Sequence, residues 1–131
     1  VDDDGVGGGV TDQLREQGIK VDALHGGAAS SDPTKWVNAR SEWWWKTRLW
    51  FAAREPDVPD DTKLQVQLTS VHWTLDSKGR IAVESKDDMR KRGVKSPDRA
   101  DALVYSLASS RAVAPVVSPS GVAGPSHNRV G

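Results

Sequence analysis

The sequence predicts a layered fold of the α/β or α+β class, in which helices flank a small sheet. Segments with the two-residue periodicity of strands alternate along the chain with segments that have helical spacing. Clusters of glycine and proline separate these segments, as expected for turns between packed elements. The chain of 131 residues is long enough for one modest domain, and we find no internal repeat in it.

The first two expected elements are the end of a strand and a helix. Residues 1–4 have the character of a strand end, and a glycine-rich turn follows over residues 5–9. Apolar residues from Val6 to Leu14 recur at helical spacing, and Gly18 is expected to end this helix.

A second strand and a long helix are expected next. Residues 19–24 alternate as a half-buried strand does, and two glycines, Gly26 and Gly27, follow it. Residues 35–54 carry a continuous helical pattern that closes before Pro56.

Tryptophan is concentrated in the expected long helix. Trp36, Trp43 and Trp50 recur every seven residues and would share one helix face, with Trp44 and Trp45 beside it. Aromatic rings can stack on nucleic-acid bases, but a stripe at this spacing more commonly packs against a core. We therefore expect these rings to be structural.

The remaining elements are a short helix, a hairpin and a final helix. The short helix is expected over residues 59–68, and the strands of the hairpin over residues 71–75 and 80–84. Ser96 is expected to cap the last helix, with Pro97 at its first helical position.

Residues 1–111 are expected to form the domain. Residues 112–131 are rich in proline, glycine and serine and lack periodicity, which predicts a disordered tail. No apolar run is long enough for a transmembrane helix, and no signal-peptide pattern is present. The absence of cysteine excludes disulfides, thiolate metal sites and a cysteine nucleophile.

An acidic run precedes the glycine-rich turn. Asp2 and Asp4 would point to one face of the strand and Asp3 to the other. Three carboxylates would repel a bare phosphate, but they suit a divalent cation held between acid and phosphate. An ordinary acidic surface turn is the alternative.

The last helix carries a second acidic position. Asp101 lies on the rim of an apolar stripe formed by Ala100, Leu103, Val104, Leu107 and Ala108. A carboxylate at a buried edge needs a partner, which a metal ion or an arginine could supply. Asp98 lies further toward solvent, where the helix dipole accounts for it. Asp101 is therefore the better candidate ligand.

A basic segment leads into this helix, although 18 basic and 18 acidic residues give the chain a net charge of zero. Its positive residues, Lys86, Arg90, Lys91, Arg92 and Lys95, could hold a phosphate backbone across a metal site. The alternative is an ordinary solvated loop.

Taken together, these motifs resemble the C-terminal nuclease domain of the large terminase subunit of tailed phages. The resemblance covers residues 1 to about 110 in order. The runs that carry it are Val1–Gly7, Asp12–Leu14, Asn38–Trp44, Glu84–Gly93 and Ser96–Ala102.

The resemblance implies an RNase H-like fold, with a mixed sheet flanked by helices. The family's first catalytic aspartate and its ATPase motor have no counterpart in this sequence. We therefore expect an N-terminally truncated domain, with the sheet incomplete at that end, that cleaves DNA poorly alone.

The resemblance also implies a function, the cutting of concatemeric viral DNA by a metal-dependent endonuclease. Asp2 and Asp101 would be catalytic and would bind two Mg²⁺ or Mn²⁺ ions about 3.5–4 Å apart, with Asp98 and Asp4 as further candidate ligands. We expect Asp2 and Asp101 to lie close together. The basic residues from Lys86 to Lys95 would contact DNA phosphates without reading sequence.

The implied partners are double-stranded DNA, the terminase ATPase domain, the small terminase subunit and the portal, in the cytoplasm of a bacterial host. Two alternatives remain open at this stage. The chain could be a catalytically inactive DNA-binding or packaging-interaction remnant. It could also be a junction resolvase of the RuvC type, which would dimerise and prefer branched DNA.

Overall fold

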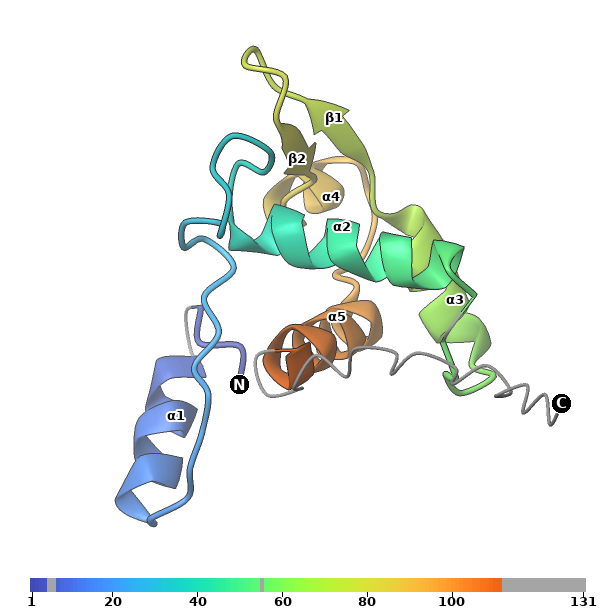
Figure 1. Cartoon of the computed structure of the whole chain (residues 1–131). Coiled ribbons are helices and arrows are strands. Elements are labelled where there is room, and N and C mark those ends of the chain that lie inside the picture. The colour runs from blue at the N-terminus through green and yellow to red at the C-terminus, as the bar shows by residue number, and fades with distance from the viewer. Residues whose placement is uncertain (5–6, 55, 112–131) are drawn as a thin grey trace, which may run out of the picture.

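A computed structural model describes residues 1–4, 7–54 and 56–111 of the chain (Figure 1). Its elements are α1 (Gly7–Glu16), α2 (Ala39–Ala52), α3 (Thr62–Ser70), β1 (Trp73–Leu75), β2 (Ile81–Val83), α4 (Lys86–Lys91) and α5 (Asp98–Arg111). The expected disordered tail, residues 112–131, lies outside the described residues. Within the described part, no helix is long and apolar enough to span a membrane.

Side-chain caps fix where three of the helices begin. Asn38 accepts a hydrogen bond from the N–H of Ser41 and so starts α2. Asp61 caps α3 in the same way, and Ser85 caps α4. Each cap satisfies a backbone donor that the first turn of a helix leaves unpaired.

The strands β1 and β2 form an antiparallel hairpin in which Trp73 pairs with Val83 and Leu75 with Ile81. Gly79 has a φ of 75° in the connecting turn, a conformation that favours glycine. A single parallel bridge joins Trp36 to Ile81 on the other edge of β2. The segment before α2 is therefore held against the hairpin.

Helix α2 runs through the middle of the molecule (Figure 1). The hairpin and α4 lie on one side of it, and α5 and α3 lie on the other. The core forms where α2, α3 and α5 meet, and its buried residues are Trp44, Leu64, Ala100, Val104 and Tyr105. This packing fixes the positions of α2 and α5 relative to each other.

The N-terminal segment reaches the core without forming a strand. Helix α1 packs against no other helix or strand of the described part and extends away from it (Figure 1). An isolated parallel bridge joins Asp2 to Leu24, with hydrogen bonds from Asp3 N to Leu24 O and from Leu24 N to Val1 O. The expected strand over residues 19–24 is thus wrong except at Leu24, because two short segments paired only with each other make a marginal ladder.

The long helix is shorter than expected and buries a different tryptophan. It begins at Ala39, since Asn38 caps it and the preceding residues pair with β2. Trp36 therefore lies outside the helix, and the expected stripe of Trp36, Trp43 and Trp50 is wrong. Trp44 is the buried ring, at 8% exposure.

Further boundaries differ from expectation. The short helix expected over residues 59–68 is α3, Thr62–Ser70, and the strands expected over residues 71–75 and 80–84 are shorter. Part of the basic segment, which could have been a loop, forms the helix α4 behind its Ser85 cap. The last helix begins at Asp98 rather than at Pro97, whose carbonyl accepts the N–H of Asp101. Helix ends commonly differ by one residue in this way.

Candidate functional site

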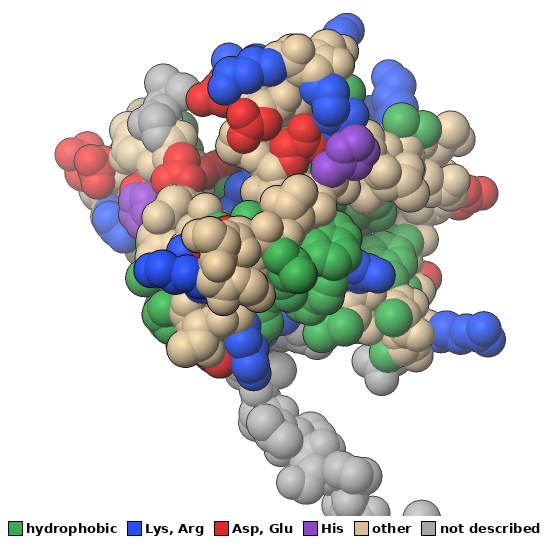
Figure 2. Space-filling view, turned by 90° about the horizontal axis from the view of Figure 1, so that it is seen from above, with side chains coloured by type: hydrophobic (Ala, Val, Ile, Leu, Met, Phe, Trp, Pro, Cys, Tyr) green, Lys and Arg blue, Asp and Glu red, His purple; other side chains and the backbone are tan. Residues whose placement is uncertain are grey.

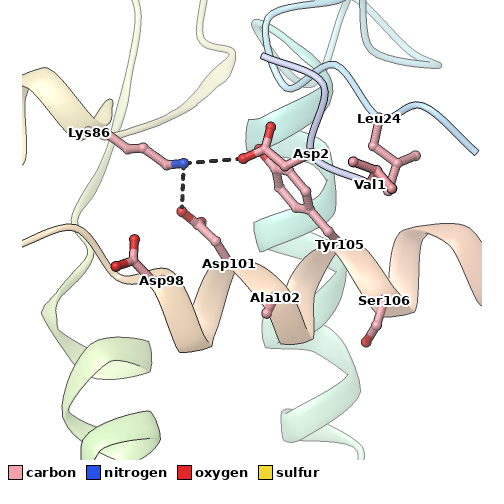
Figure 3. Close-up of a pocket in the computed structure, with 9 residues that line it drawn as sticks. All are labelled: Val1, Asp2, Leu24, Lys86, Asp98, Asp101, Ala102, Tyr105 and Ser106. Carbon is pink, nitrogen blue, oxygen red and sulfur yellow. Dashed lines mark hydrogen bonds and ion pairs between the residues drawn. The ribbon is translucent and has the colours of Figure 1, made fainter. Parts of the chain in front are cut away.

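A pocket of about 450 Å³ brings the two acidic positions together (Figure 3). Its lining residues are Val1, Asp2, Leu24, Lys86, Asp98, Asp101, Ala102, Tyr105 and Ser106. Lys86 Nζ lies 3.3 Å from Asp2 Oδ2 and 3.4 Å from Asp101 Oδ2. Both carboxylates are thus within reach of one ammonium group, and the expected proximity of Asp2 and Asp101 is found.

Three separate parts of the chain supply these groups. The bridge to Leu24 places Asp2 beside α5, and Asp101 lies in the first turn of that helix. Lys86 is the first residue of α4, directly after the Ser85 cap. The two helix starts therefore determine how the lysine meets the carboxylates.

Asp101 is buried, and its two oxygens have different surroundings. Oδ1 accepts hydrogen bonds from Arg40 Nη1 at 2.6 Å and from the indole Nε1 of Trp44 at 3.1 Å. Oδ2 is also buried, makes no hydrogen bond in the described structure, and faces the Lys86 ammonium. One oxygen is therefore fixed by the protein and the other is directed into the pocket.

The charges in the pocket stabilise the protonated form of Lys86. Burial by itself would lower the pKa of Lys86, but the negative charges of Asp101 and Asp2 outweigh it and raise that pKa above its ordinary value. Burial raises the pKa of the neighbouring Tyr105, and the charge of Asp2 adds to this effect. The pocket thus holds a cation between two anions beside a neutral phenol.

The other two candidate ligands differ in position. Asp98 is exposed and lines the same pocket, one turn before Asp101 on α5 (Figure 3). Asp4 does not line it, because its carboxylate accepts the N–H of Gly26 at 2.8 Å and faces His25. The structure therefore gathers Asp2, Asp98 and Asp101, and it places Asp4 elsewhere.

Most of the basic candidates have acidic neighbours. Arg90 pairs with Asp87, and Lys91 with Asp88, on the exposed face of α4.

Arg92 is held more firmly than its neighbours. It binds the carboxylate of Glu84 and also donates to the carbonyl of Ser70. Lys95 lines a different pocket, beside α3.

Seen from above, Lys and Arg side chains stand beside Asp and Glu, so the described residues form no continuous basic patch on this face (Figure 2).

The donor set fits a divalent cation that keeps part of its water shell. Among the described residues, no group of three or more His, Asp or Glu side chains is close enough to enclose an ion. Two carboxylates do converge, and Asp101 Oδ2 is buried without a hydrogen bond. Mg²⁺ is commonly held by one or two carboxylates together with waters and substrate phosphates. The site matches that pattern.

The sequence allowed an arginine as the partner of Asp101, and Arg40 is that arginine, but the particular residues around Asp101 were not predicted. Arg40 and Trp44 were not singled out as site residues, and Lys86 was expected on phosphates rather than between carboxylates. Arg40 and Trp44 are four residues apart, a spacing that places both on one helix face. The sequence does contain a signal for this arrangement. An arginine and a tryptophan four residues apart can both donate to one carboxylate that lies at a buried edge of another helix.

Helix α2 packs on the small sheet, α3 and α5 pack with each other, and carboxylates gather at one pocket; this arrangement matches the RNase H-like fold of terminase nuclease domains. The chain is similar to the nuclease domain of the large terminase subunit gp2 of bacterial virus Sf6, with 26% identity and a TM-score of 0.61. A lysine-to-alanine variant of that domain with manganese gives 25% identity and a TM-score of 0.62. The same variant domain with calcium gives 24% and 0.62.

These matches cover 79% of this chain and 61% to 62% of the solved domains, so the chain spans about three fifths of their length. They confirm the resemblance to terminase nuclease domains that the sequence indicated. A comparison with family models finds no match, and neither does one with curated proteins.

Proposed function

We propose that the chain is the metal-dependent endonuclease part of a phage genome-packaging terminase, which cuts concatemeric double-stranded DNA. The observation that supports this most directly is the convergence of Asp2 and Asp101 on one pocket from opposite ends of the described chain. The likeness in fold to the Sf6 nuclease domain supports the reaction class.

In this proposal, Asp2 and Asp101 hold the divalent cations, and Asp98 receives a water or an ion at the rim of the pocket. When bound, Mg²⁺ or Mn²⁺ would supply an activated water and stabilise the leaving oxygen of the phosphodiester. Asp101 contributes a fixed direction, because its Oδ1 is held by two donors. The long side chain of Lys86 can leave the carboxylates and turn toward a phosphate.

Arg90, Lys91 and Lys95 would contact the DNA backbone in this arrangement. Arg92 contributes instead to the fold, through Glu84 and Ser70. Contacts of this kind position DNA without selecting a sequence. By the same family likeness, we propose that the chain acts with a terminase ATPase domain, the small terminase subunit and the portal, in the host cytoplasm.

A plasmid-nicking assay with the 131-residue chain tests the proposal. With Mn²⁺ or Mg²⁺ we expect slow nicking that falls by about 100-fold in Asp2→Asn and in Asp101→Asn, since losing a direct ligand should cost at least as much as losing a group that supports one, which costs about 10–100-fold. Asp57→Asn removes an exposed carboxylate away from the pocket and is the matched control. Nicking that continues at the original rate in both site variants would overturn the assignment.

One observation favours a second candidate, a DNA-binding module without catalysis. The Lys86 ammonium already bridges the two carboxylates, and the described residues offer no third enclosing ligand. This candidate predicts duplex binding by the chain without nicking at any Mn²⁺ concentration. The same assay, combined with a binding measurement, separates the two.

A further inference from the structure

We infer that Arg40 and Trp44 are positioning residues, which fix Asp101 so that only its Oδ2 atom is presented to a cation. This inference rests on the proposed function, because it deepens the role of the same site. It concerns how the Asp101 carboxylate is oriented. The evidence is that Oδ1 accepts two hydrogen bonds and Oδ2 accepts none.

Both donors come from one face of α2. Arg40 and Trp44 are one helical turn apart, and the guanidinium lies over the indole ring at 5.5 Å from its centroid. Both donate to the same atom, Asp101 Oδ1. The donors therefore converge on a single oxygen and leave the other, Oδ2, without a hydrogen bond and facing the Lys86 ammonium at 3.4 Å.

The arginine itself is held in place from three directions. Its backbone N–H donates to Gly26 O at 2.9 Å, and its Nε donates to Glu84 O at 3.4 Å. The ring of Trp44 supports the plane of the guanidinium. Only 9% of the Arg40 side chain and 6% of the Asp101 side chain are exposed, so neither group has room to change its geometry freely.

The geometry differs from that of a bidentate ion pair. Arginine and aspartate often pair through two parallel hydrogen bonds that use both carboxylate oxygens. Here Arg40 Nη2 and Asp101 Oδ2 are both buried, and neither has a hydrogen-bond partner among the described residues. Leaving these atoms unpaired carries a cost that a bidentate pair would avoid. On the carboxylate side, the Lys86 ammonium lies 3.4 Å from Oδ2, and a divalent cation that displaced it would coordinate this oxygen directly.

Supporting groups of this kind alter the affinity of a site for its metal. Residues that hydrogen-bond a ligating carboxylate typically alter metal affinity or activity by about 10–100-fold. Trp44→Phe removes the N–H donor and keeps a smaller aromatic ring in the core. Arg40→Lys keeps the positive charge and removes the planar group that lies over the indole.

The experiment measures Mn²⁺ binding by the full chain from the electron paramagnetic resonance of free Mn²⁺, with the melting temperature recorded for every variant. We expect Trp44→Phe and Arg40→Lys to weaken Mn²⁺ binding by about tenfold or more. The matched controls, Trp45→Phe and Arg48→Lys, lie on the same helix but do not contact Asp101, and they should bind Mn²⁺ like the original chain.

Each outcome is decisive for the positioning role. If folded Trp44→Phe and folded Arg40→Lys bind Mn²⁺ as well as the original chain, the inference is wrong. If Asp101→Asn binds Mn²⁺ normally, or the original chain binds none, Oδ2 is not directed at a cation and the inference also fails. Weakened binding in both variants supports it even where no nicking is seen, an outcome that would count against the proposed nuclease alone.

Discussion

Lys86 stands where a divalent cation would be expected. Its ammonium lies between Asp2 Oδ2 and Asp101 Oδ2, and the carboxylates in turn keep it protonated. A divalent cation can displace the Lys86 ammonium, which has a single charge and a flexible side chain. Until it is displaced, the ammonium competes with the divalent cation for the two carboxylate oxygens. The residue that balances the charge of the pocket should therefore also weaken metal binding.

Removing the competing ammonium should strengthen the binding of a divalent cation. We expect Lys86→Met to tighten Mn²⁺ binding about fivefold, which corresponds to about 1 kcal/mol, the upper end of what one partly exposed charge contributes. Calorimetric titration with Mn²⁺ measures the change. Lys91→Met removes an exposed charge from the same helix and should leave the affinity within about twofold. Weaker binding in Lys86→Met would show that the ammonium does not compete.

At the scale of single elements, the cap of α2 links local sequence to the site. Asn38 accepts the N–H of Ser41 at 2.9 Å, and the first turn that it stabilises contains Arg40. We expect Asn38→Ala to lower the free energy of unfolding by about 1 kcal/mol, while Asn38→Asp, which keeps an acceptor oxygen, retains it. Urea unfolding at neutral pH measures both. Equal losses in the two variants would contradict the capping role.

The junction between β2 and α4 should depend on pH. The hydrogen bond from Arg92, helped by the backbone N–H of His72, lowers the pKa of Glu84 below its ordinary value of 4.5 despite desolvation. Because the pKa is lower in the folded state, this stabilisation is present above pH 4.5 and is lost as the pH falls through the folded-state value.

The corresponding variant is Glu84→Gln. Its unfolding free energy should be lower than that of the original chain at pH 7, and the two should converge as the pH falls below the folded-state pKa of Glu84, where the carboxylate is protonated. Asp87→Asn, in the exposed pair with Arg90, should show a much smaller difference at pH 7. A gap between Glu84→Gln and the original chain that is constant with pH would contradict this assignment.

Local signals predicted elements well where the chain determines them by itself. The hairpin, the helix after Asp61 and the last helix follow from turns and caps that can be recognised in the sequence. Residues 19–24 have strand periodicity, but their pairing depends on a neighbouring strand, and a single bridge at Leu24 is all that forms. Trp44 is buried through packing against α3 and α5, which helix periodicity alone does not specify.

At the scale of the whole molecule, the proximity of Asp2 and Asp101 could be anticipated, and their surroundings could not. An aspartate at a strand end and an aspartate on the buried edge of a helix each need an oppositely charged partner. One pocket brings both beside the same cation. The partners of Asp101 come from α2 and α4, so they depend on how three helices pack. The charge pattern of the sequence predicted that Lys86 would contact DNA phosphates, whereas it lies between Asp2 and Asp101. The order of charges along the chain does not specify which carboxylates come close to a lysine in the fold.

The distribution of charge over the molecule predicts weak, salt-sensitive DNA binding. Basic and acidic residues balance, and Arg90 and Lys91 have acidic neighbours three positions away on an exposed helix face. Such surface pairs are worth little, so a phosphate backbone can displace the carboxylates. Arg92 is excluded from this set because it holds Glu84 and Ser70 together.

Replacing Arg90, Lys91 and Lys95 together by alanine should therefore weaken duplex binding without unfolding the chain. Each lost phosphate contact should reduce the slope of log affinity against log salt by about one. A matched variant removes three exposed bases elsewhere, Arg15, Lys20 and Lys78, and should keep the original slope if they face away from the DNA. Fluorescence anisotropy with a labelled duplex over a range of salt concentrations measures both. If the two variants lose the same slope, binding is spread over the whole surface, and the segment from Arg90 to Lys95 has no special role in placing DNA across the carboxylates.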